Sequence, residues 1–255
     1  MTLRVLTWNY LIIAPHVLLI VLLVALVRSR TYRQFPAFVA YVASEILQFV
    51  VLYPILTLPS VFPPALYAVA YSIGTGLSIG LRLLVLYEVT AYLFRNHELL
   101  RRVGGQLFRC MALALLLSAL GLAAYTGGMS FHRLLSTLNL LDRTASILQC
   151  GLLVGLFSFS SYFGISWRSH AFGIALGLGI FASVELANSS IRTHVGYAYN
   201  MYLNYLTMVV YHACVLIWII YLWAPERSSQ YALKTLPEHN LEDWNQELQR
   251  LIQRG

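Results

Sequence analysis

The chain has 255 residues, of which 59% are hydrophobic and only 11% are charged. Soluble domains carry about 25% charged residues, so this composition excludes a soluble globular protein and is typical of a chain that lies mostly in lipid. The net charge of +7 does not indicate nucleic-acid binding, because the arginines lie in short loops between apolar runs, where membrane topology explains them.

Seven apolar segments are long enough to form transmembrane helices, each of which needs about 20 mainly apolar residues. The first covers 10–27; it is too long for the core of a signal peptide and lacks a small-residue cleavage site, so it is interpreted as a true span. The other six cover 35–56, 65–94, 107–125, 134–165, 171–191 and 197–223. The sequence therefore predicts an all-α membrane protein, with a seven-helix bundle over residues 1–224 and a tail over 225–255.

Lysine and arginine are distributed unevenly between the two sides of these spans. Ten of them follow spans one, three, five and seven, whereas the opposite side carries Arg4, Arg133 and Arg192. Basic residues accumulate on the cytoplasmic side of membrane proteins. We therefore expect the N-terminus outside, the C-terminus in the cytoplasm, and a multi-pass location in the cell membrane, specifically a bacterial inner membrane.

The tail contains apolar residues at helical spacing, which predicts an amphipathic helix over about 241–253. Asn240 precedes it and is a suitable N-cap residue. Such a helix lies on the inner leaflet and the inner loops, or it docks a cytoplasmic or membrane protein partner together with those loops. Both interpretations remain open from the sequence.

Ionisable and amide side chains interrupt the apolar spans, where each charge costs a few kcal/mol and usually faces the bundle interior. Helical spacing places them, with other polar residues, on one face of five helices. The sequence thus predicts one polar cavity that opens outward. Its candidate ligand-binding residues are Arg82, Asp142, Arg143, Glu45, Glu185, His16, Asn188, Asn200 and Asn204.

The charges in this predicted cavity do not balance, because it has three acids and two arginines. Two Arg–carboxylate pairs, one for each arginine, would leave one acid over. That acid is protonated, paired with protonated His16, or neutralised by a ligand. The cluster therefore serves to fix the helices, to bind a ligand or ion, or to conduct protons.

Three further features have simple structural interpretations. Glu88 is expected at the inner interface near Arg95. Gly173 and Gly177 form a small-residue face, which favours close helix packing. The cysteines, which lie in or beside apolar runs without a common spacing, are expected to be free thiols rather than metal ligands or disulfides. They are Cys110, Cys150 and Cys214.

The predicted layout resembles that of seven-helix receptors and microbial rhodopsins. A retinal protein is excluded, because retinal needs a lysine in span seven and Lys234, the only lysine, lies in the tail. Haem ligation by His16 and His212 is disfavoured, because their depths differ by more than about 10 Å. No cofactor is therefore expected, and the receptor motifs themselves are absent.

The function favoured by these features is that of a receptor or sensor that binds a small polar ligand and signals through its cytoplasmic loops and tail. A non-catalytic subunit of a membrane complex and a transporter or channel for an ion or small solute are the alternatives. An enzyme is not expected, because no nucleophile–base pair or metal-ligand set occurs at a defined spacing.

Overall fold

The computed structural model describes residues 3–58, 61–93, 131–160, 169–195 and 200–223, together with residues 105, 106, 109, 113 and 249. Six long helices and one short 3₁₀ helix make up the regular structure of this part of the chain. They are α1 (Leu3–Arg28), η1 (Thr31–Arg33), α2 (Pro36–Thr57), α3 (Pro64–Leu93), α5 (Phe131–Ser160), α6 (His170–Val195) and α7 (Asn200–Trp223).

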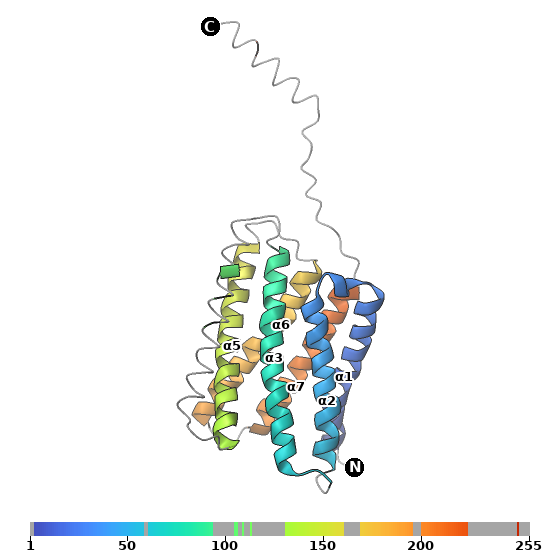
Figure 1. Ribbon diagram of the computed structural model, residues 1–255, viewed down its shortest axis with the longest axis vertical. Helices are drawn as coiled ribbons and strands as arrows, with labels where there is room; N and C mark the ends of the chain where they lie inside the picture. Colours follow the sequence, from blue (N-terminus) through green and yellow to red (C-terminus); the bar gives the residue numbers. More distant parts are fainter. Residues whose placement is uncertain are drawn as a thin grey trace.

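The long helices lie side by side in one bundle (Figure 1). Each packs against the next of the described helices in chain order, and α7 returns to α1, so the six form a closed ring. In addition α3 contacts α6 across the ring. A side chain on α3 can therefore reach α2, α5 and α6, and this position determines where the polar residues meet.

Five of the described helices are long and apolar enough to cross a membrane: α1, α2, α3, α6 and α7. The protein is thus an all-α, multi-pass membrane protein. With 30 residues, α5 is as long as α3 but less apolar, because its first half carries Arg133, Asp142 and Arg143.

The six helices lie over six of the seven segments predicted from hydropathy. The largest differences are at the ends, since α1 already begins at Leu3 and α6 continues to Val195. Hydropathy marks the lipid-crossing part of a helix, whereas backbone hydrogen bonds continue into the polar interface. The predicted span 107–125 falls, apart from two residues, outside the described residues, and so does the predicted tail helix 241–253 apart from residue 249.

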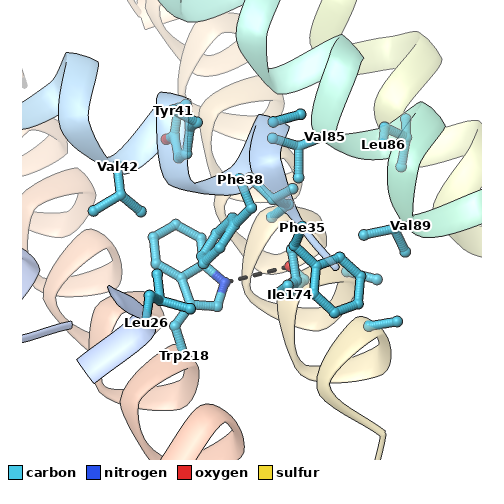
Figure 2. Close-up of a cluster of buried hydrophobic side chains, with 14 of the residues drawn as sticks. Leu26, Phe35, Phe38, Tyr41, Val42, Val85, Leu86, Val89, Ile174 and Trp218 are labelled. Carbon is cyan, nitrogen blue, oxygen red and sulfur yellow. Dashed lines mark hydrogen bonds between the residues drawn. The ribbon is translucent and has the colours of Figure 1, made fainter. Parts of the chain in front are cut away.

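A cluster of buried aromatic and aliphatic side chains joins all six of the described long helices, with Leu153 as the buried member from α5 (Figure 2). Trp218 lies at its centre with 1% of its surface exposed. Its ring meets the rings of Phe38 and Tyr41 edge-on, with centroid distances of 5.3 and 6.1 Å. The indole N–H donates to the carbonyl of Ile174 over 3.3 Å, so the one polar atom of this large side chain is satisfied.

Two glycines of α6 allow α7 to pack this closely. A Cβ on Gly177 would overlap the indole of Trp218, and a Cβ on Gly173 would overlap Tyr221. The predicted small-residue face is confirmed as a contact within the bundle.

A carboxylate from α3 caps the start of α2. The first turn of α2 contains Pro36, and its N-cap residue Phe35 supplies no side-chain hydrogen bond. The N–H groups of Ala37 and Phe38 instead donate to the two carboxylate oxygens of Glu88, over 3.0 and 3.1 Å. The carboxylate is attracted by these unpaired N–H groups and by the positive end of the helix. Arg95, the residue near which Glu88 is expected from the sequence, lies outside the described residues.

Replacing Gly177 with alanine should destabilise the bundle, because the new methyl group forces Trp218 and α7 away from α6. We expect a loss of about 1–3 kcal/mol, measured as a lower thermal unfolding temperature in detergent or nanodiscs. Gly155→Ala on α5 is the matched control, since its Cβ would meet no atom within 4 Å. Equal stability of the two variants would contradict the close-packing interpretation.

Replacing Glu88 with alanine should cost about 0.5–2 kcal/mol, because two N–H groups at the start of α2 lose their acceptor. Glu88→Gln should lose less, since its amide oxygen can still accept one hydrogen bond. The measurement is unfolding of each variant at one detergent concentration. A larger loss for glutamine than for alanine would show that the cap is not the stabilising interaction.

Candidate functional site

Arg82 is the centre of a buried ionic cluster. It belongs to α3 and is 6% exposed. Its Nη1 donates to Oε2 of Glu185 on α6 over 2.8 Å, and its Nη2 donates to Oδ1 of Asp142 on α5 over 2.5 Å. The planar guanidinium has separate donors on its two terminal nitrogens, so one side chain can hold two carboxylates from two helices. Three helices are thereby joined in the bundle interior.

Glu45 extends this cluster to α2. Its Oε1 accepts a hydrogen bond of 2.6 Å from the hydroxyl of Ser78 on α3. Ser78 lies one helical turn before Arg82, about 6 Å along the axis. One turn further, Gln48 of α2 fills the space beside Gly74 of α3, where a Cβ would overlap it. The close approach of α2 and α3 brings the third acid within one turn of the guanidinium.

The formal charge of the cluster is −2, since three carboxylates (−3) share one guanidinium (+1). The sequence predicts a separate arginine for each of two acids, but the two ion pairs found in the described residues both belong to Arg82. Arg143 follows Asp142 directly, and adjacent side chains on a helix point about 100° apart. Arg143 is half-buried on α5 and does not share the face of α5 that meets Arg82.

Aromatic rings from four helices lie at the same level of the bundle. His16 of α1 stacks on Phe49 of α2 with a centroid distance of 3.9 Å. The ring of Tyr211 on α7 is 6.1 Å from His16 and 5.4 Å from Phe181 on α6. Phe49 and Phe181 each lie one turn from an acid of the cluster, Glu45 and Glu185 respectively. The acids are therefore bordered by aromatic surfaces on the α1, α2, α6 and α7 side.

The hydrogen bond of His16 determines its tautomer. Nδ1 lies 2.7 Å from the carbonyl oxygen of Ile12. A carbonyl only accepts, so Nδ1 carries the proton, and Nε2 is an acceptor when the ring is neutral. His16 thus adds an acceptor beside the aromatic layer.

Around the cluster, three buried polar atoms have no hydrogen-bond partner among the described residues: Arg82 Nε, Ser146 Oγ and Tyr211 Oη. Ser146 is 2% exposed and lies one turn after Asp142. It also lies between Asp142 and Gln149, which reach α3 and α6 respectively. Its hydroxyl therefore faces the same interior. Buried polar groups are nearly always paired, so three unpaired atoms around one ionic cluster are unusual.

The predicted asparagines form a separate contact between α6 and α7. The Nδ2 group of Asn188 donates to Thr207 Oγ1 over 2.7 Å and to the carbonyl of Leu203 over 3.3 Å. Asn204 accepts a hydrogen bond of 2.6 Å from Arg192. The side chain of Asn200 lies outside the described residues. Oδ1 of Asn188 has no partner among the described residues. The contacts of these asparagines link α6 with α7 and do not join the Arg82 cluster directly.

A groove of about 1020 Å³ lies elsewhere, between α1 and α7 on the outside of the bundle. Its lining is mainly aliphatic, and His212 lies at its wall beside Tyr10, with ring centroids 5.8 Å apart. Its chemistry suits lipid chains rather than a polar ligand. The candidate polar site is therefore the cluster around Arg82.

The charged groups and hydrogen-bonding atoms of the cluster are suited to binding a polar ligand. Within the described part of the chain, no three His, Cys, Asp or Glu side chains are grouped to hold a metal ion.

Two residues beside the cluster, Phe49 and Phe181, are not singled out by the sequence. Phenylalanines are common in spans, so nothing in the sequence marks these two.

Comparison of the chain with family models, with curated proteins and with solved structures finds no match.

Replacing Arg82 with glutamine should destabilise the bundle by about 3–5 kcal/mol, because Asp142 and Glu185 would be left as buried charges without a cation. The double variant Arg82→Gln, Glu185→Gln should recover part of this loss, since one of the two acids is removed. Thermal unfolding of the purified variants measures both effects. Arg192→Gln is the control, because its contact with Asn204 is exposed; a loss as large as that of Arg82→Gln would refute the assignment.

Proposed function

We propose that the protein is a seven-helix membrane receptor or sensor, with its N-terminus outside, which binds a small polar ligand at the Arg82 cluster and signals through its cytoplasmic loops and tail. The observation that carries the proposal is the geometry of Arg82. One buried guanidinium holds acids from two helices, and a third acid lies one turn away with no cation of its own in the described part of the chain.

This arrangement gives a ligand a direct way to change helix packing. A ligand that pairs with one of the acids, or accepts from Arg82, changes the electrostatic interactions among α2, α3, α5 and α6. It then favours whichever arrangement of these helices binds it more tightly. The same contacts that stabilise the bundle would therefore respond to the ligand.

In this proposal the protein acts in the cell membrane, specifically a bacterial inner membrane, without a cofactor and without catalysis. The response would reach a cytoplasmic or membrane protein partner through the inner loops and the segment 241–253. Ten Lys and Arg residues that follow spans one, three, five and seven up to Lys234, against three on the opposite side, support this orientation.

The test uses the full-length protein in lipid nanodiscs and follows thermal unfolding with a panel of amino acids, amines, carboxylates and sugars at constant ionic strength. At least one class should raise the unfolding temperature. The shift should be lost in Glu185→Gln and in Arg82→Lys, because lysine lacks the two-pronged donor geometry. Arg192→Gln should retain it.

Two results would refute the proposal. In one, no member of the panel shifts the unfolding temperature of the native protein. In the other, a shift occurs but is unchanged in both Glu185→Gln and Arg82→Lys.

A further inference from the structure

The third acid of the cluster differs from the other two in its partners. Asp142 and Glu185 each bind the guanidinium of Arg82, whereas Glu45 receives one neutral hydrogen bond, from Ser78. An ionised carboxylate in a membrane interior is stabilised by pairing with a cation, because an unpaired charge is strongly unfavourable there. Glu45 is thus the acid at which additional positive charge is most favourable. A second cation beside Asp142 or Glu185 would be repelled by Arg82.

The surroundings of Glu45 select the kind of cation. On its own helix the neighbours one turn away are Tyr41 and Phe49, and His16 stacks on Phe49. Tyr211 of α7 faces the same region, since its ring centroid lies 6.1 Å from that of His16. Aromatic faces attract organic ammonium groups, and a protonated amine can in addition donate two or three hydrogen bonds.

Acceptors for those hydrogen bonds are present at this level. Tyr211 Oη is buried and unpaired, and Nε2 of neutral His16 is an acceptor. The unpaired hydroxyl of Ser146, a side chain that is 2% exposed, lies deeper, one turn from Asp142. These unpaired groups are an observation independent of the acid cluster, and they indicate that the polar layer is completed by a bound molecule.

We propose that the ligand of this site is a small protonated amine, which pairs with the carboxylate of Glu45 and donates to Tyr211 and His16. The inference rests on the proposed ligand-binding function and specifies the class of ligand. Arg82 retains its two acids, so binding adds a cation to a cluster of charge −2 rather than displacing the existing one. The chemistry recognised is an ammonium group beside aromatic rings, and the rest of the ligand is left open.

The experiment measures thermal unfolding of the full-length protein in nanodiscs with methylammonium and ethylammonium chloride at constant ionic strength and pH. Sodium chloride and acetamide serve as the inorganic cation and the neutral solute. The amines should raise the unfolding temperature by roughly 2–4 °C in a saturable way, whereas sodium and acetamide should not.

Variants then assign the effect to Glu45. Glu45→Gln should raise the half-saturating amine concentration roughly tenfold or more, because a charge-assisted hydrogen bond is lost. Tyr211→Phe keeps the aromatic ring but removes the hydroxyl, and it should raise the half-saturating amine concentration roughly three- to tenfold. Glu88→Gln is the matched control, since this acid joins the same two helices but bonds to backbone N–H groups; it should leave the amine response unchanged.

The proposal is overturned if amines do no more than sodium, if Glu45→Gln responds like the native protein, or if acidification alone gives the full stabilisation and amines add nothing to it. If Glu45→Gln does not fold, Tyr211→Phe and the comparison with sodium decide the question. An anionic or neutral solute that stabilises through Arg82 while amines do not would overturn the amine proposal but preserve the proposed function.

Discussion

The bundle depends on one guanidinium that is buried among carboxylates. A lone arginine in a lipid-embedded helix is costly, and so is a lone acid. The ion pairs with Asp142 and Glu185 offset the cost of burying the charge of Arg82. The same ion pairs offset the cost of burying the two carboxylates. This mutual requirement fixes the rotation of α3, α5 and α6 about their axes, since a turn of about 100° would remove any of the three side chains from the contact. Apolar packing alone allows many rotations of such helices, because lipid chains solvate an apolar face equally well.

Around this contact the bundle is divided into layers of different chemistry. One layer is apolar and dense, with Trp218, Phe38 and Tyr41 packed against the glycine face of α6 (Figure 2). The next contains the acids and Arg82, bordered by His16 and Tyr211. The dense apolar layer excludes water, which lowers the local dielectric constant. The electrostatic interactions in the layer of the acids and Arg82 are therefore stronger. A change of one charge there has a larger effect on helix packing than it would have at the surface.

Much of this arrangement could be predicted from the sequence. Hydropathy located the described helices, since about 20 apolar residues are a strong signal, and helical spacing placed Ser78 with Arg82 and Asp142 with Ser146 on shared faces. What spacing cannot provide is the partner across the bundle. Arg143 and Arg82 are equally plausible partners for Asp142 in the sequence, and only the packing of α3 against α5 distinguishes them. Glu88 shows the same limit, because the N–H groups that donate to its carboxylate lie on a helix about 50 residues away along the chain.

The contacts between α2 and α3 recur along most of their length. Ala37 meets Glu88 near one end, Glu45 meets Ser78 near the middle, and Gln48 fills the space beside Gly74 one turn further. Two of these contacts are hydrogen bonds to a carboxylate, and all three belong to one antiparallel register, so sliding either helix by a single residue would break them together. The two helices therefore form a stiff two-helix unit against which α5 and α6 can be displaced, and any motion coupled to the central charges has this pair as its fixed support.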